Sequence, residues 1–175
     1  MSEIDAFIQW IVSLVSQNIY PGVFLAALIE TVFPPIPSEV VFPLAGYSIL
    51  KNEMNVFHVV GVGITGGAGA TVGAFVIYII SKRLGRVGLI KYLKYAKIKE
   101  NSLKKADHWF EKYGDKSVII GRVIPGIREL VSIPAGIFNM NPIKFLIFTL
   151  IGSCIWSIAL TGAGYYFGIA TLNIF

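Results

Sequence analysis

The sequence predicts an all-helical integral membrane protein with two inverted repeats, each a re-entrant helical hairpin followed by a transmembrane helix. Of its 175 residues, 55% are hydrophobic and 14% are charged, and the mean hydropathy is +0.70. These values are too apolar for a soluble domain. Two apolar segments are interrupted by prolines and charges, and each precedes an uninterrupted apolar stretch long enough to span a bilayer. Residues 1–175 are therefore expected to form a single membrane domain.

The first part of the chain is expected to lie in the membrane interface. Residues 1–20 carry apolar side chains at helical spacing with polar side chains between them, which predicts an amphipathic helix. Glu3 and Asp5 stand where a cleavable signal peptide would carry basic residues. We therefore expect no such peptide here.

The segment 21–50 is predicted to be the first re-entrant hairpin. Its helix must break near the middle, because proline lacks a backbone donor and blocks the helical hydrogen-bond ladder. The hairpin-tip prolines are Pro34, Pro35 and Pro37. Broken backbone at membrane depth survives only where it packs in protein or lines a wet cavity, and an acid at that depth indicates a functional site. Glu30 and Glu39 flank the break and are candidates for proton coupling or gating.

Residues 56–81 form an apolar stretch that is long enough to cross the membrane with some tilt. The glycines at 61, 63 and 66 formally match a dinucleotide-binding fingerprint, but no strand precedes them and no acid follows at ribose distance. Nucleotide binding is therefore not expected. The GxxxG steps Gly63/Gly67 and Gly69/Gly73 predict close helix packing, either within the monomer or in a homodimer.

Residues 82–116 hold eleven lysines and arginines against four acids, a local net charge of +7. The positive-inside rule makes this segment cytoplasmic. A set of apolar residues recurs in it at helical spacing: Leu103, Ala106, Phe110 and Tyr113. The spacing predicts a cationic amphipathic helix on anionic lipids of the inner leaflet. Because membrane segments flank the basic run and it has no recognition motif, no nucleic-acid partner is expected.

Residues 117–140 form the second interrupted segment, with Pro125 and Gly126 at the predicted hairpin tip, and residues 142–173 form the second transmembrane helix.

The two interrupted segments resemble each other in sequence. Residues 33–47 and 123–137 share five of fifteen residues at an offset of 90. The identical pairs are Pro35/Pro125, Glu39/Glu129, Val41/Val131, Ala45/Ala135 and Gly46/Gly136. With a shorter offset, Gly69 and Gly85 align with Gly152 and Gly168. If the segment 56–81 descends to the cytoplasm, the two hairpins are inverted copies whose tips meet near the midplane.

Two hairpins meeting in this way bring opposite charges into one buried site. Glu30 and Glu39 come from the first hairpin, and Arg122, Arg128 and Glu129 come from the second. The planar guanidinium suits a phosphate, and carboxylates at low dielectric can exchange protons near neutral pH. The pattern therefore favours an anionic phosphate headgroup held by Arg122 and Arg128. Structural ion pairs that merely fix the hairpins are the alternative.

The chain closely resembles the bacterial DedA family of the SNARE-associated/VTT superfamily over about residues 19–168. The resemblance rests on the acids at 30 and 39 with the prolines between them, on GRVIPGIR (121–128), and on the PAG that follows at 134–136. It implies a multi-pass protein of the bacterial cytoplasmic membrane, dependence on the proton motive force, and flipping of undecaprenyl phosphate or scrambling of phospholipids. It also implies that Glu30, Glu39, Arg122 and Arg128 are the essential residues. Glu129 departs from the small hydroxyl residue expected there.

The sequence analysis thus predicts a lipid-phosphate flippase, without catalytic residues, metal or cofactor. One rival is a proton- or cation-coupled transporter of a small solute that uses the same acids. A lipid phosphatase is a second rival, but no cluster of histidine, serine or metal ligands accompanies the arginines. A structural or assembly factor is a third. The single cysteine, Cys154, excludes a disulfide framework and a cysteine-rich metal site.

Overall fold

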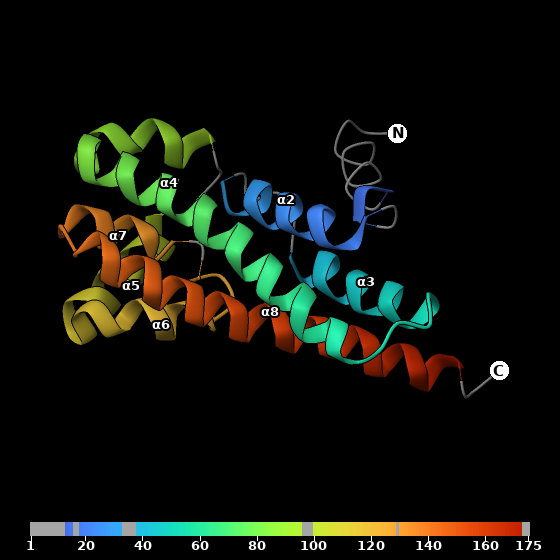
Figure 1. The fold of residues 1–175 in the computed structure, drawn as a ribbon. Coiled ribbons are helices and arrows are strands. Elements are labelled where there is room, and N and C mark those ends of the chain that lie inside the picture. Colours follow the sequence, from blue (N-terminus) through green and yellow to red (C-terminus); the bar gives the residue numbers. More distant parts are fainter. Residues whose placement is uncertain (1–12, 16–17, 33–37, 96–99, 129, 173–175) are drawn as a thin grey trace.

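The computed structural model describes residues 13–15, 18–32, 38–95, 100–128 and 130–172 (Figure 1). Over these residues the chain consists of helices and turns without a strand, which confirms the predicted all-helical class. The helices are α2 (Ile19–Val32), α3 (Ser38–Lys51), α4 (Phe57–Tyr95), α5 (Glu100–Tyr113), a short 3₁₀ helix η1 (Gly114–Lys116), α6 (Ser117–Arg122), α7 (Ser132–Ile137) and α8 (Pro142–Leu172). Most of the segment 1–20, expected to be an amphipathic helix, lies outside the described residues.

Two long helices form the centre of the bundle. Within the described ranges, Phe57–Gly85 of α4 and Pro142–Gly168 of α8 are long and apolar enough to cross a membrane, with mean hydropathies of 1.7 and 2.0. Both exceed the roughly 20 residues that a bilayer core requires. The first span ends at Gly85, whose φ of 61° suits glycine, and Figure 1 shows the green ribbon changing direction at that end of α4. The second span starts at Pro142, after Asn141 caps it by accepting hydrogen bonds from the next backbone N–H groups.

Glycines let the neighbouring helices approach α4 on two different faces. A Cβ added at Gly63 or Gly67 would lie 2.8 Å from a backbone nitrogen of α8. A Cβ added at Gly69 or Gly73 would instead collide with backbone carbonyl oxygens of α2. The two GxxxG steps predicted from the sequence therefore serve packing within the monomer, one against each partner helix.

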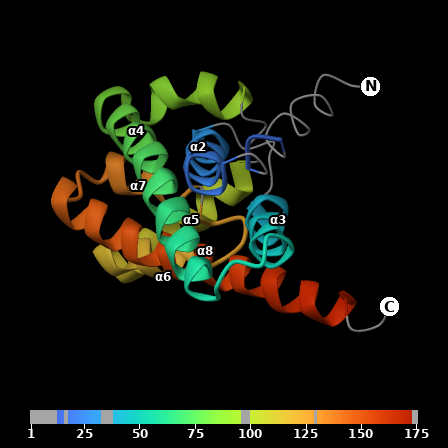
Figure 2. The ribbon, with the colours of Figure 1, turned by 45° about the vertical axis from the view of Figure 1, so that its right-hand side comes forward.

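The shorter helices pack on the two long ones in a crossed pattern. α2 packs on α4 and α3 packs on α8, whereas α6 packs on α8 and α7 packs on α4. Figures 1 and 2 show α2 and α3 at one end of the bundle and α5, α6 and α7 at the other. Gly46 of α3 lies against the Thr161 carbonyl of α8, and Gly136 of α7 lies against the Tyr78 carbonyl of α4. The pair α2 and α3 and the pair α6 and α7 thus lie at opposite ends of the bundle.

A compact cluster around Tyr78 holds α7 and α8 to α4. Tyr78 is fully buried, its ring stacks on Phe145 at 4.6 Å between centroids, and its hydroxyl donates a 2.6 Å hydrogen bond to the Met140 carbonyl. The amphipathic helix α5 contributes Phe110 and Ala106, which are buried against protein. The apolar face of α5, which the sequence predicts to rest on lipid, is therefore partly covered by α6 and α7, because burial against protein also removes apolar side chains from water.

Candidate functional site

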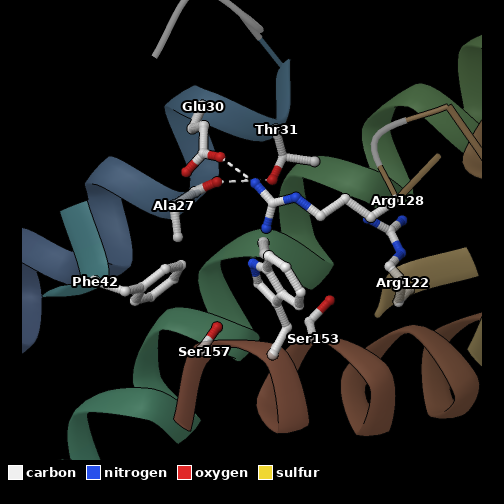
Figure 3. A pocket seen from close by; sticks show the side chains of 10 residues that line it. Ala27, Glu30, Thr31, Phe42, Arg122, Arg128, Ser153 and Ser157 are labelled. Carbon is white, nitrogen blue, oxygen red and sulfur yellow. Dashed lines mark hydrogen bonds and ion pairs between the residues drawn. The ribbon is translucent and has the colours of Figure 1, made fainter. Parts of the chain in front are cut away.

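A buried ion pair lies where the two helix pairs meet. Glu30, in the last turn of α2, is 2% exposed although it stands in an otherwise apolar helix. The Arg128 guanidinium Nη2 donates a short hydrogen bond to the Glu30 Oε1, and the two side chains are 12% and 3% exposed, respectively. Figure 3 shows the carboxylate and the guanidinium facing each other across the space between α2 and the segment that carries Arg128. Residues 98 positions apart are thus joined in the interior.

The local backbone explains how Arg128 reaches this position. The helix α6 ends at Arg122, and turns follow, because Pro125 cannot donate to a helical ladder and Gly126 has a φ of 77°. The Ile124 carbonyl then accepts hydrogen bonds from the backbone N–H groups of Ile127 and Arg128, at 3.3 and 3.1 Å. The result is a tight irregular segment over residues 123–128, from which the Arg128 side chain extends toward α2 (Figure 3).

Arg122 lies beside Arg128 in Figure 3 and is itself buried, at 4% exposed. Its Nη2 donates a 2.6 Å hydrogen bond to the Ser132 hydroxyl, at the start of α7. The bond joins the end of α6 to the start of α7 across the break in the helix. Arg122 therefore both fixes the shape of this segment and contributes positive charge to the site.

Both arginines and Glu30 line one cavity. Its remaining lining comes from α2, α3, α4 and α8: Ala27, Thr31, Phe42, Ala70, Ser153, Trp156 and Ser157. The space that the centres of water molecules can occupy there is about 20 Å³, which is room for about one water. A phosphate group needs more than this. In this structure the cavity has no room for a phosphate, and the Arg128 guanidinium is paired with Glu30.

The other predicted site residues lie elsewhere. Glu39 is exposed in the first turn of α3 and does not line the cavity. Pro125 and Gly126 are exposed in the turn between α6 and α7. Glu129 and the prolines of the first hairpin tip, Pro34, Pro35 and Pro37, lie outside the described residues.

Sequence reasoning missed the contribution of α8 to the cavity. Ser153, Trp156 and Ser157 line it, and the Trp156 ring lies 5.4 Å from the Arg128 guanidinium carbon, a cation–π contact. A signal for them exists in the sequence. Hydroxyl side chains recur every four residues along α8, at Thr149, Ser153, Ser157 and Thr161, and all four are buried. A polar line of this kind marks the face of a spanning helix that turns inward.

Comparison with known proteins identifies the family. The VTT domain matches residues 36–166, which include α3, α4, α6, α7, Arg128 and most of α8. The chain belongs to the VTT domain family. The VTT-domain proteins most similar to it include undecaprenyl phosphate transporter A of Staphylococcus aureus, 33% identical over 87% of this chain and 75% of that one. DedA of Escherichia coli is 29% identical over 94% of this chain and 76% of its own length.

A third VTT-domain relative carries a different name. The alkaline phosphatase-like protein of Lactococcus lactis subsp. cremoris is 34% identical over 90% of this chain and 75% of its own. No solved structure matches the chain. The family match, the transporter names and the two candidate spans together make this VTT-domain protein a membrane protein of a family with lipid-phosphate transporters.

Proposed function

We propose that this protein is a translocase of lipid phosphates in the bacterial cytoplasmic membrane, with undecaprenyl phosphate as the leading substrate. The observation that carries the proposal is the buried ion pair between Glu30 and Arg128, at a cavity that Arg122 also lines. Guanidinium groups bind carboxylate and phosphate with the same fork of N–H donors, so a phosphate can take the place of the carboxylate. Relatives named undecaprenyl phosphate transporter A in two bacteria support the choice of substrate.

Proton exchange at Glu30 supplies the coupling in this proposal. A carboxylate that accepts a proton loses the charge by which it holds Arg128, and the phosphate headgroup then occupies the guanidinium. Because the closed cavity has room for only about one water, the headgroup enters as the helix pairs separate. The polyprenyl tail stays in the bilayer throughout, so a small protein has to move only the headgroup. Glu39, exposed at the start of α3, is a second proton-exchanging group in the proposal.

An inverted repeat would allow the two helix pairs to separate in two equivalent ways. We propose that α2–α3 and α6–α7 are re-entrant hairpins related by a two-fold axis in the membrane plane. Two contacts support this relation, since Gly46 and Gly136 each meet a carbonyl of the other half's long helix. These glycines are 90 residues apart and the carbonyls, of Thr161 and Tyr78, are 83 apart. The spacing of 83 residues between the two carbonyls is also the offset that aligns Gly69 with Gly152.

The basic segment sets the orientation in the proposal. Lys105 and Lys112 are exposed on α5 while Ala106 and Phe110 are buried, so α5 presents positive charge to anionic headgroups of the inner leaflet. The end of the bundle that holds α5, α6 and α7 then faces the cytoplasm. The chain crosses the membrane more than once in this arrangement, with α4 and α8 as full spans.

A second candidate function is proton-coupled transport of a small solute or ion. The observation that favours it is the size of the closed cavity, which accepts a water more readily than a headgroup. The two functions differ in what moves across the membrane. Lipid movement with dependence on the headgroup supports the first, and solute or ion flux without lipid movement supports the second.

Reconstitution tests both functions in one preparation. Liposomes containing labelled undecaprenyl phosphate in both leaflets are treated with an added phosphatase, which reaches only the outer leaflet. Wild-type protein should expose the inner-leaflet lipid, and more so when a proton gradient is imposed. Arg128→Ala should leave only the outer-leaflet lipid accessible. Arg83→Ala, an exposed arginine of α4, is the matched control and should behave as wild type.

Each alternative predicts a different result in these liposomes. Wild-type flipping rates in Arg128→Ala refute the role given to Arg128. Ion flux without lipid movement replaces the proposal with the solute transporter. Release of inorganic phosphate by the purified protein alone would instead indicate a phosphatase, as the name of the Lactococcus relative implies for that protein.

A further inference from the structure

The indole of Trp156 has an unusual place in the cavity wall. Its ring lines the cavity and lies 5.4 Å from the Arg128 guanidinium carbon. Its Nε1 is buried and makes no hydrogen bond within the described part of the chain. A tryptophan in a membrane protein commonly places this N–H at the polar interface, where water accepts from it. Trp156 instead lies in the middle of the spanning helix α8.

A buried N–H without an acceptor is unfavourable. Buried tryptophans usually find a partner, because leaving the donor unsatisfied costs about 1–3 kcal/mol. In this region the surrounding lipid supplies no acceptor, so the partner has to come from the protein or from the cavity. The Glu30 carboxylate is the anionic acceptor among the cavity-lining side chains, and in this structure it accepts from Arg128. A water or a ligand in the cavity is therefore the remaining acceptor for the indole, and an anionic ligand is the stronger acceptor of the two.

We propose that Trp156 is a second donor for the bound anion, donating its indole N–H to a phosphate oxygen while its ring supports the Arg128 guanidinium. The inference rests on the proposed function, because it takes the lipid phosphate as the ligand. Arg128 would supply the charge and Trp156 a neutral hydrogen bond. Both donors would contact a phosphate in the space between α2 and α8 that Glu30 leaves when it releases Arg128.

The chemistry of indole suits this role. Its N–H donates and cannot accept, so it favours an oxyanion over water, which needs acceptors for its own protons. It carries no charge, so it adds a hydrogen bond without adding a buried cation that would have to be neutralised. The ring face meanwhile attracts the guanidinium through its quadrupole. The same side chain thus orients the cation and contacts the anion.

Trp156→Phe separates these two contributions, because phenylalanine keeps an aromatic face for Arg128 and removes only the N–H. Binding of farnesyl phosphate to purified protein in detergent is measured by calorimetry, with farnesol as the ligand that lacks the phosphate. Since a hydrogen bond to a charged group is lost, the Kd should rise by about tenfold or more in Trp156→Phe. Trp109→Phe is the matched control. Trp109 lies on α5, where it contacts Tyr113 and does not line the cavity, so its replacement should leave the Kd unchanged.

The outcomes distinguish this inference from the proposed function. Binding that Arg128→Ala abolishes and that Trp156→Phe leaves at the wild-type Kd overturns the role of Trp156 and leaves the function standing. Absence of farnesyl phosphate binding by the wild-type protein overturns the proposed function, and this inference with it. Weakening in Trp156→Phe that is equal for farnesyl phosphate and farnesol also overturns the inference, because it places the effect on the apolar tail.

A second measurement observes the wild-type protein with Trp156 in place, so the Trp156→Phe variant serves only to assign one resonance. In protein labelled with ¹⁵N-tryptophan, the indole N–H resonance that is missing from Trp156→Phe is assigned to Trp156. Farnesyl phosphate should move this resonance downfield, because its proton gains an anionic acceptor, while the Trp109 resonance stays in place. An unmoved Trp156 resonance at saturating farnesyl phosphate would show that the N–H does not contact the anion.

Discussion

Replacing Glu30 by Gln removes the carboxylate that accepts from Arg128 and leaves the guanidinium charge in the interior. The two side chains are 3% and 12% exposed, so water can do little to solvate the remaining charge. Breaking a buried ion pair from one side costs about 3–5 kcal/mol. Glu30→Gln and Arg128→Gln should each lower the free energy of unfolding by about this much. The double variant should lose less than the sum of the two, because it leaves neither charge behind.

The pair between Lys144 and Asp115 provides the control within the same protein. Its atoms are 3.3 Å apart, but the side chains are 61% and 38% exposed. An exposed pair of this kind contributes about 0–1 kcal/mol, so Lys144→Gln should have little effect. The contrast between the two pairs therefore tests burial, since both are formed by one basic and one acidic side chain.

Equilibrium unfolding in mixed micelles, with an increasing fraction of SDS and helicity as the signal, measures all four variants. The midpoint should fall in the two single variants of the buried pair and recover part of the loss in the double variant. Strict additivity of Glu30→Gln and Arg128→Gln would refute the argument, because uncoupled residues do not form an ion pair. An effect of Glu30→Gln as small as that of Lys144→Gln would refute it equally.

Three further predictions concern packing. Gly67→Val should destabilise the fold by about 1–3 kcal/mol in the same assay, because a Cβ there lies 2.8 Å from the Cys154 backbone nitrogen. The control is Gly162→Ala, which should be neutral because the nearest atom to its Cβ is 3.7 Å away. Equal losses of stability in the two variants would contradict the close packing of α4 on α8. Tyr78→Phe should cost about 1–3 kcal/mol, since the Met140 carbonyl loses a buried donor while the ring stack on Phe145 is kept, and an unchanged midpoint would exclude that bond. Gly85→Ala should cost about 1 kcal/mol or more from its positive φ alone, because nothing lies within 4 Å of the added Cβ, whereas an added stability would show a regular helix at this position.

Several features of the fold followed from the sequence because they depend on local rules. A membrane interior admits helices and excludes unsatisfied backbone, so apolar stretches predicted α4 and α8, and Pro125 predicted the interruption between α6 and α7. The glycine spacing on α4 predicted two close contacts, and α8 and α2 fill them. The prediction that a buried acid of the first segment meets an arginine of the second followed from the energy of an isolated charge, and Glu30 and Arg128 meet it.

Other features depended on how helices rotate about their axes and how turns carry the chain, which spacing in a uniformly apolar helix leaves open. Glu30 and Glu39 have equal standing in the sequence, yet the rotation of α2 buries one while the start of α3 exposes the other. Arg122 and Arg128 lie six residues apart, yet the turn at Gly126 sends one to Ser132 and the other to Glu30. Trp156 reads as one more aromatic residue of an apolar span. Its ring lies over Arg128 only because the tertiary structure brings α8 next to the turn that carries Arg128, a contact between distant parts of the chain that local sequence rules do not determine.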